Sequence, residues 1–240
     1  MSIAIIGAME EEVEVFRGRL ENVRRSEAAG GIYDTGTLEG REIVLLQGGV
    51  GKVNAALTTA LLIERYRPEL IINTGSAGGI GSGVRIGDVV VAAELAYSDV
   101  DATAFRRYVY GQVPRMPARY PVQEGFLALA RRLSADRETE ESVFTGLITT
   151  ADSFIGRREA ADLIRERFPE SLATDMEGAS VAQTAYQFGV PFLAVRAISD
   201  IAGSDAEGLF TSNLDLAARN AARFVLEWLD LYRLAYSAGQ

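Results

Sequence analysis

The chain has 240 residues, of which 48% are hydrophobic and 24% are charged, a balance typical of a soluble globular protein. Its formal net charge of −9 argues against binding to nucleic acid or to an anionic membrane, because both attract basic protein surfaces. Cysteine and histidine are absent from the sequence, which excludes disulfides and zinc–thiolate sites and leaves acid–base chemistry to carboxylates, Tyr, Lys or Arg.

The sequence contains no linker, internal repeat or low-complexity tract, which favours one domain over residues 1–240. The first residues have neither the basic region nor the long apolar run of a signal peptide, and their pattern indicates a strand. Because no apolar run reaches the length of a membrane span, we expect a cytoplasmic protein.

Short apolar runs alternate with helix-like stretches along the chain, which favours a mostly parallel sheet covered by helices. Strands are predicted, in chain order, at residues 3–6, 32–38, 43–46, from 70 onward, 84–93, 146–150, 172–175 and 192–195. Helices are predicted to begin within residues 9–12 and to span residues 53–66, 126–133, 157–167, 176–188 and 213–232.

Three acidic residues open the first predicted helix. Glu10, Glu11 and Glu12 suit the first turn of a helix electrostatically, and this explains at least two of them. The remaining glutamate could project from the strand–helix junction into a cleft.

Two glycine-rich segments follow strands. Residues 48–52 lack the spacing of a P-loop, and no Ser or Thr follows Lys52, so we reject a nucleoside-triphosphate site and favour a tight turn. Residues 73–79 lack the dinucleotide fingerprint, but so small a loop lets backbone N–H groups and the Ser76 hydroxyl approach a ligand closely. A bulged strand end explains this second segment equally well.

The polar segment at residues 101–112 carries three aromatic side chains, Phe105, Tyr108 and Tyr110. A solvated connection does not need so many, which suggests a pocket wall or a subunit contact. Anchoring of the loop on the core is the alternative.

The apolar run at residues 192–195 is predicted to be a strand buried on both faces. Arg196, Ser199 and Asp200 then fall at its carboxyl end, where ligands bind in open α/β sheets. A partly desolvated carboxyl group has a raised pKa and can donate a proton near neutral pH. Taken alone, however, Asp200 is better explained as a turn cap that pairs with Arg196.

Candidate groups follow several different strands: Glu12, Ser76, Phe154, Glu177 and Asp200. Loops after parallel strands gather on one side of a sheet, so these side chains could share one cleft. Glu177 also has a purely structural explanation, because an acid in a first turn stabilises the helix dipole. Three carboxylates without His or Cys suit cleavage of a glycosidic bond, in which one acid protonates the leaving group and water attacks the anomeric carbon.

The chain resembles the 5′-methylthioadenosine/S-adenosylhomocysteine nucleosidases of the nucleoside phosphorylase superfamily. The shared segments are GAMEEE at 7–12, NTGSAGG at 73–79, DATAF at 101–105, ME at 176–177 and RAISD at 196–200. The resemblance runs from residue 2 to about residue 232, in order and at similar spacing. It implies a single-domain, three-layer α/β fold with a mixed, mostly parallel central sheet.

The resemblance implies hydrolysis of 5′-methylthioadenosine and S-adenosylhomocysteine, and of 5′-deoxyadenosine, to adenine and the 5′-substituted ribose. Asp200 would protonate N7 of adenine, Glu12 would position and deprotonate the attacking water, and Glu177 would hold the ribose hydroxyls. No metal or cofactor is implied. The physical logic agrees, because both acid and base act where charge develops in an oxocarbenium-like transition state.

Further substrate contacts are implied around these three carboxylates. Met176 would lie near the sugar, and Ser199 and Arg196 would orient Asp200 and its surroundings. The remaining implied contacts of the sugar and base side are Met9, Val50, Ser76, Ala77 and Gly78.

The resemblance also implies an aromatic site for the base and a partner subunit. Phe154 would stack on adenine, the backbone at Phe154 and Ile155 would read its edge, and Phe210 would cover the site from the loop after Asp200. The family forms homodimers, and the residues implied to reach over the partner's 5′ substituent are Phe105, Tyr108 and Pro114. Ser98, where the family often has His, leaves the preferred 5′ substituent open.

Three rival functions compete with this one. Phosphorolytic relatives carry an Arg where this chain has Asn73, and Glu12 would repel phosphate, so hydrolysis is favoured over purine nucleoside or uridine phosphorolysis. Hydrolases of futalosine-type nucleosides share the same carboxylates and differ only in the pocket. A non-catalytic nucleoside-binding protein has no need for both Glu12 and Asp200.

Overall fold

The computed structural model describes residues 2–137, 139–204 and 206–237, over which the chain forms ten strands and six helices. The strands are β1 (Ile3–Gly7), β2 (Glu21–Ala28), β3 (Gly31–Leu38), β4 (Arg41–Gln47), β5 (Leu70–Gly79), β6 (Val89–Tyr97), β7 (Tyr120–Pro121), β8 (Val143–Thr150), β9 (Ser171–Asp175) and β10 (Phe192–Ile201). The helices are α1 (Glu10–Arg17), α2 (Lys52–Tyr66), α3 (Glu124–Asp136), α4 (Arg158–Arg167), α5 (Gly178–Phe188) and α6 (Ala206–Ser237).

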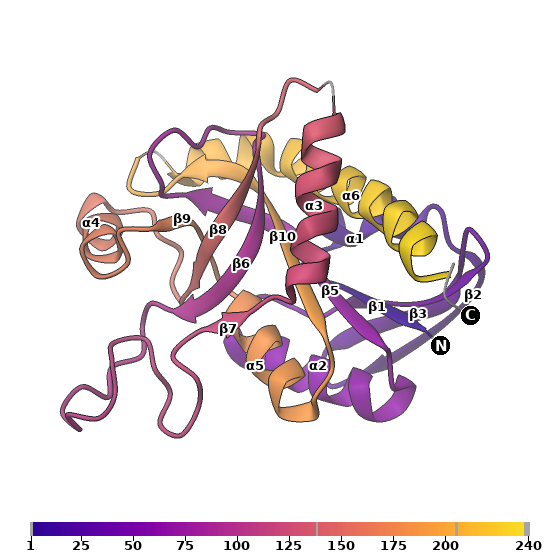
Figure 1. The fold of residues 1–240 in the computed structure, drawn as a ribbon, viewed down its shortest axis with the longest axis horizontal. Coiled ribbons are helices and arrows are strands. Elements are labelled where there is room, and N and C mark those ends of the chain that lie inside the picture. The colour runs from indigo at the N-terminus through magenta and orange to yellow at the C-terminus, as the bar shows by residue number, and fades with distance from the viewer. Residues whose placement is uncertain (1, 138, 205, 238–240) are drawn as a thin grey trace.

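The strands form one mixed sheet, which confirms the predicted α/β class (Figure 1). β5 pairs in parallel with both β1 and β10, and β1 continues through β4 and β3 to β2. On the other side, β10, β6, β8 and β9 follow one another, and β9 returns to pair with the end of β5. Five strands therefore close into a ring, from which β1, β4, β3 and β2 extend as an open arm.

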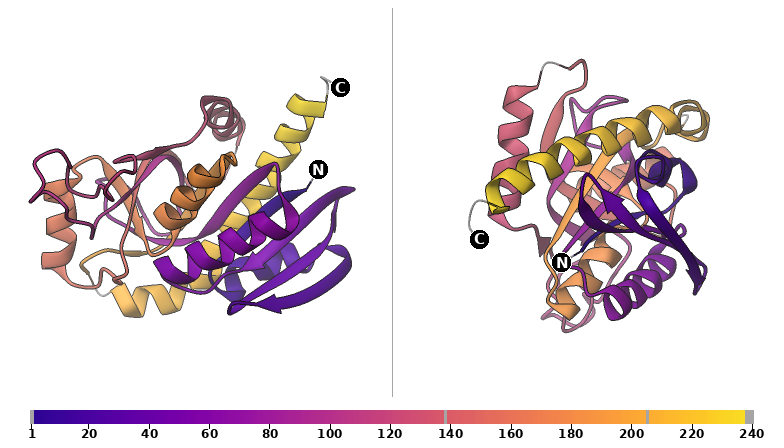
Figure 2. Two further views of the ribbon diagram at one scale, coloured as in Figure 1. Left: turned by 90° about the horizontal axis from the view of Figure 1, so that it is seen from below. Right: turned by 90° about the vertical axis from the view of Figure 1, so that its right-hand side faces the viewer.

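Helices cover both faces of this sheet and give the three layers that were predicted (Figures 1 and 2). α2 and α5 pack side by side on one face, whereas α1, α3 and α6 pack together on the other. The interior strands need cover on both faces, because β1 and nearly all of β10 are buried. On the second face, the buried Trp228 of α6 donates its indole N–H to the Phe126 carbonyl of α3 at 3.1 Å. Within the described ranges, no helix combines the length and the apolar character that a membrane span requires.

Two strands were not predicted. β2 is polar and mostly exposed, so it shows no apolar alternation, and β7 is only two residues long. β2 forms because a tight turn with positive φ at Ala29 and Gly30 folds it back on β3. The pairing is reinforced by Arg25, whose guanidinium bonds to the buried Asp34 of β3 at 2.7 and 2.9 Å.

Several element boundaries also differ from the prediction, among them the starts of β6 and α6. β6 begins at Val89 instead of residue 84, because Gly87 takes a positive φ in the preceding turn. α6 begins at Ala206 instead of residue 213, so the predicted loop after Asp200 is reduced to residues 202–204 of the described chain, and residue 205 lies outside the described ranges. Phe210 is consequently a helical residue. The first turns of α6 are too polar and exposed to show helical periodicity in the sequence.

Candidate active site

A pocket opens at the carboxyl ends of β1, β5, β9 and β10. It encloses about 470 Å³ of empty space, its open mouth included. The residues that line it are Ala8, Met9, Glu12, Val50, Ser76, Ala77, Gly78, Phe154, Thr174, Asp175, Met176, Glu177, Ser199, Asp200 and Phe210.

Glu12 lies in the first turn of α1 and also lines the pocket, so both explanations offered for the acidic cluster apply to it. Its Oε2 accepts hydrogen bonds from the N–H groups of Ala8 (2.8 Å) and Met9 (3.2 Å), which caps the helix. Its Oε1 accepts from the N–H (2.8 Å) and the hydroxyl (3.0 Å) of Ser76 on β5. These bonds fix a carboxylate that is only 5% exposed at the wall of the pocket.

β5 continues as a strand through the small-residue segment at residues 73–79. The segment consists of small residues because two carboxyl groups of the protein lie very close to its backbone. A Cβ atom at Gly75 would lie 2.5 Å from Glu12 Oε1, and one at Gly78 would lie 3.1 Å from Asp200 Oδ2. The segment therefore makes room for the protein's own carboxyl groups, as well as lining the pocket.

Asp200 lies within β10, not beyond its end as predicted, because the strand continues to Ile201. The pairing of β10 with β5 shifts between Ile198 and Asp200, which makes Ser199 a bulged residue. The Ser199 hydroxyl donates to Asp200 Oδ1 at 2.8 Å. Burial raises the pKa of Asp200, which is 2% exposed, although the bond from Ser199 partly opposes this effect. A raised pKa suits a proton donor.

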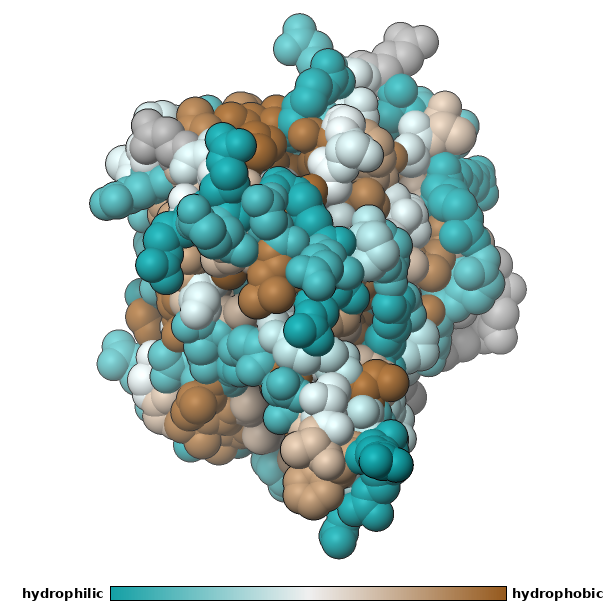
Figure 3. All heavy atoms as spheres, turned by 90° about the vertical axis from the view of Figure 1, so that its left-hand side faces the viewer, coloured by the Kyte–Doolittle hydropathy of each residue, from teal (hydrophilic) through white to brown (hydrophobic). Residues whose placement is uncertain are grey.

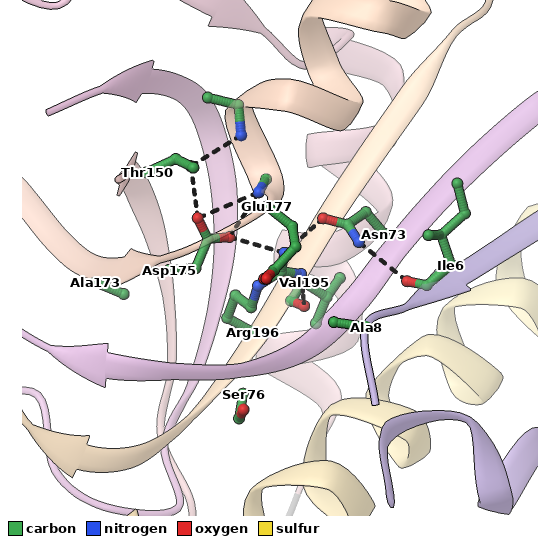
Figure 4. Close-up of polar contacts among 12 residues, drawn as sticks. Ile6, Ala8, Asn73, Ser76, Thr150, Ala173, Asp175, Glu177, Val195 and Arg196 are labelled. Carbon is green, nitrogen blue, oxygen red and sulfur yellow. Dashed lines mark hydrogen bonds and ion pairs between the residues drawn. The ribbon is translucent and has the colours of Figure 1, made fainter. Parts of the chain in front are cut away.

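Of the two residues predicted to orient Asp200 and its surroundings, only Ser199 bonds to Asp200. Arg196 bonds elsewhere (Figure 4). The Arg196 guanidinium forms an ion pair with Asp175 at 2.7 Å and donates to Asn73 Oδ1 at 2.5 Å. Side chains alternate along a strand, and the bulged Ser199 reverses that alternation, so Arg196 and Asp200 face different neighbours. Arg196 is 2% exposed and lies behind the residues that line the pocket.

Asp175, at the end of β9, is a pocket residue that the sequence analysis missed. Besides pairing with Arg196, it accepts hydrogen bonds from the Thr150 hydroxyl (2.5 Å) and from the Gly178 N–H at the start of α5 (Figure 4). The signal that could have revealed it is the one used for the other candidates, a carboxylate between a predicted strand and a predicted helix. Thr174 and Ala8 were missed as well; both are pocket neighbours of predicted residues.

Glu177 precedes α5 and accepts a hydrogen bond from the Gly51 N–H at 2.7 Å. Burial, together with the charges of Asp175 and Glu12, raises the pKa of Glu177 to about 8, against the opposing effects of the Gly51 N–H and Arg196. The glutamate therefore lies in the acidic part of the pocket, and the glycine-rich turn before α2 supplies a donor to it.

Two aromatic rings stand at one side of the pocket. Phe154 and Phe210 meet edge to face, with 5.8 Å between ring centroids and 71° between planes. Phe154 is 47% exposed, which leaves much of its surface available to a flat ligand. A smaller adjoining cavity lies among Phe154, Ile155, Met176 and Asp200, so an aromatic wall and a buried carboxyl group border the same space.

The three residues predicted to act on a partner subunit do not line the pocket of their own chain. Phe105, Tyr108 and Pro114 lie between β6 and β7, in a segment that projects from the lower end of the molecule (Figures 1 and 3). Phe105 is 62% exposed and contacts Tyr108 edge to face, with ring centroids 6.4 Å apart.

The model of one protein family, described as the phosphorylase superfamily, matches residues 2–230. A 5′-methylthioadenosine/S-adenosylhomocysteine nucleosidase from Geobacillus sp. (strain WCH70) is 48% identical over 226 residues, 94% of this chain and 97% of the relative. A nucleosidase of the same name from Listeria innocua is 48% identical over 231 residues, 95% of this chain and 99% of the relative.

A crystal structure of the Neisseria meningitidis 5′-methylthioadenosine/S-adenosylhomocysteine nucleosidase, in complex with methylthio-immucillin-A, has a similar fold. Its TM-score is 0.91 at 42% identity, over 95% of this chain and 98% of that one. Together with the family match, these similarities show that the chain belongs to the phosphorylase superfamily and, within it, to the 5′-methylthioadenosine/S-adenosylhomocysteine nucleosidases.

Proposed function

We propose that the chain hydrolyses the N-glycosidic bond of 5′-methylthioadenosine and S-adenosylhomocysteine, and of 5′-deoxyadenosine, to adenine and the 5′-substituted ribose. The observation that carries this proposal is the lining of the pocket. It combines four carboxyl groups with an aromatic wall, in a chain that belongs to the nucleosidase family. The acidic residues of the lining are Glu12, Asp175, Glu177 and Asp200.

Asp200 is the general acid in this proposal. Departure of adenine leaves negative charge on the purine, and a proton delivered to N7 neutralises it as the bond breaks. Burial keeps the Asp200 carboxyl protonated at higher pH than an exposed aspartate, and the Ser199 hydroxyl holds Oδ1 in place. The aromatic ring of Phe154, at the adjoining cavity, supports the proposal that adenine binds next to this acid.

Glu12 is the general base in this proposal. Its carboxylate is fixed by Ser76 and by the backbone at the start of α1, so it can orient a water molecule without first ordering its own side chain. The sugar binds between acid and base, and Glu177 and Met176 contact its hydroxyl face. The Gly51 N–H keeps Glu177 at that position.

Hydrolysis is favoured over phosphorolysis by the charge of the pocket. A phosphate co-substrate needs cationic groups around it, and the pocket-lining residues, all within the described chain, include neither Lys nor Arg. Arg196 is already paired with Asp175 behind the pocket. Asn73, which stands where phosphorolytic relatives carry an Arg, donates its amide to the Ile6 carbonyl at 3.0 Å.

The test is adenine release from 5′-methylthioadenosine in phosphate-free buffer and again with added phosphate. We expect adenine and free methylthioribose at the same rate in both. Dependence on phosphate, with a sugar phosphate as product, would contradict the proposal in favour of a phosphorylase. If neither buffer supports release, a futalosine-type nucleoside is the next substrate to test.

We further propose a cytoplasmic homodimer in which the segment between β6 and β7 reaches over the partner's pocket. The support is an exposed apolar surface on α2 and α5, which lie side by side (Figure 2). Val53 and Leu57 of α2 are 74% and 51% exposed, and Tyr186 of α5 is 55% exposed. Val50, at the pocket mouth, precedes the same helix, so the apolar surface is continuous with the pocket. Sedimentation velocity tests this proposal, and a monomer at micromolar concentration would contradict it.

The match over residues 2–230 and the single continuous sheet also support the proposal that residues 1–240 act as one domain.

A further inference from the structure

The only lysine of the chain lies in a charged cluster next to the pocket but outside its lining. Lys52 Nζ lies 2.6 Å from Asp99 Oδ2 and 3.8 Å from Asp152 Oδ2, and it stands over the Tyr97 ring at 5.4 Å from the centroid. We call these four residues the Lys52 cluster. Asp99 follows β6 and Asp152 follows β8, so the ammonium group joins the start of α2 to two loops.

Backbone hydrogen bonds reinforce the Lys52 cluster. Asp152 Oδ1 accepts the N–H of Lys52 at 2.7 Å, and Asp99 Oδ2 accepts the N–H of Asp152 at 2.9 Å. Asp152 thereby caps the first turn of α2 from a distant part of the chain, a role that Gly51 lacks the side chain to fill. Gly51 adopts a φ of +97°, and a Cβ on it would lie 3.1 Å from Asp152 Oδ1. Glycine is thus required by both conformation and space.

The Lys52 cluster holds two chain segments that carry proposed substrate-binding features, the Gly51 N–H and Phe154. Gly51, next to Lys52, donates its N–H to Glu177, the proposed ribose ligand, at 2.7 Å. Phe154, the proposed adenine platform, follows Asp152 by two residues. Since Lys52 is the cation between the two aspartates, its removal leaves two like charges facing each other and frees both segments to separate.

We propose that Lys52 is a positioning residue of the nucleosidase: by bridging Asp99 and Asp152 it holds the Gly51 N–H on Glu177 and Phe154 at the base pocket. This inference rests on the proposed function. It assigns Lys52 to binding of the ribose and the base, and it leaves the proton transfers to Asp200 and Glu12.

The test compares Lys52→Met with Lys52→Arg, in steady-state hydrolysis of 5′-methylthioadenosine and in direct titration with adenine. Met keeps the length of the side chain and removes its charge, whereas Arg restores a cation between the aspartates. Because misplacement of a binding group by about 1 Å can cost up to about 100-fold, we expect Lys52→Met to raise KM about tenfold, with a smaller effect on kcat. Adenine should bind correspondingly more weakly, and Lys52→Arg should recover most of both losses.

The control is Arg131→Met, which removes an exposed ion pair between Arg131 and Glu124 on α3. It should leave KM unchanged. A purely structural role of Lys52 would reduce the folded fraction, so kcat per total protein would fall while KM and adenine affinity stayed at wild-type values. That result, or a Lys52→Met enzyme with wild-type kinetics, would overturn the inference. If the wild type released no adenine, the proposed function itself would fail. Failure of the proposed function can therefore be distinguished from failure of the inference about Lys52.

Discussion

Replacement of Asp200 by Asn tests the proton donor with little other change. Asn has the same shape, and its Oδ1 can still accept the Ser199 hydroxyl that bonds to Asp200 at 2.8 Å. Its amide takes the place of Oδ2 next to Gly78, where the absence of a Cβ leaves space. The variant therefore keeps the orientation of the side chain and loses only the transferable proton. Since general acid catalysis typically contributes about 10²- to 10⁴-fold, kcat should fall by that factor, about 3–5 kcal/mol in activation free energy.

Adenine release should be followed spectroscopically, with 5′-methylthioadenosine at saturating concentration, and binding of adenine should be titrated in parallel. Asp162→Asn, an exposed change on α4, is the matched control and should leave kcat unchanged. The stability of the two proteins gives a second readout. The pKa of Asp200 is raised by burial, so the folded state holds its proton more tightly and loses stability as the pH rises through that pKa. Asp200→Asn should therefore unfold at the same or a higher temperature than the wild type at pH 8. An Asn variant that kept near-normal kcat would refute the general-acid role.

The remaining predictions concern the other carboxylates. Glu12→Gln should lower kcat about 10²- to 10⁴-fold through loss of the base, and its amide would also face N–H donors that bond to the carboxylate in the wild type. The exposed Glu11→Gln is the control, and retained turnover in Glu12→Gln would place the base elsewhere. Gly75→Ala should abolish activity in whatever protein still folds, because the new Cβ would lie 2.5 Å from Glu12 Oε1; normal kinetics would contradict the close approach. Burial raises the pKa of Glu177 to about 8, so its contribution to stability is complete below about pH 4.5 and is lost as the pH rises to 8. Melting temperatures of ligand-free wild type should therefore decline over this interval more steeply than those of Glu177→Gln, and parallel curves would show that the carboxyl group ionises freely.

The parts of the fold that could be predicted from the sequence are those with strong local patterns. β1 and β10 are almost entirely buried, so their apolar runs were plain. Apart from the start of α6, the helices with one apolar face were found within a few residues of their ends. β2 could not be found this way, because it is polar and forms through a turn and through its pairing with β3. The closure of five strands into a ring depends on contacts between distant segments, for which no local pattern exists.

The same distinction applies to the candidate site. The carboxylates Glu12, Glu177 and Asp200 were found because each follows a strand or opens a helix, and the structure brings all three to one pocket. The ion pair between Arg196 and Asp175 was not predicted. The bulge at Ser199 shifts the strand register, so that Arg196 and Asp200 face different neighbours, and the sequence gives no sign of this bulge. The partner-subunit residues Phe105, Tyr108 and Pro114 remain predictions, since their proposed contacts involve a second copy of the chain.

The closed ring of strands has a consequence for self-association. In the part of the chain that the structure describes, each strand of the ring has a neighbour on both sides, whereas β2, at the end of the open arm, pairs only with β3 and leaves its outer side as a sheet edge. That edge is the least apolar strand of the sheet and carries acidic and basic side chains in close succession, Glu21, Arg24, Arg25 and Glu27. Charges on an edge strand discourage a second sheet from adding to it, because their desolvation opposes strand pairing. The exposed polar character that concealed β2 in the sequence thus also disfavours growth of the sheet by strand addition.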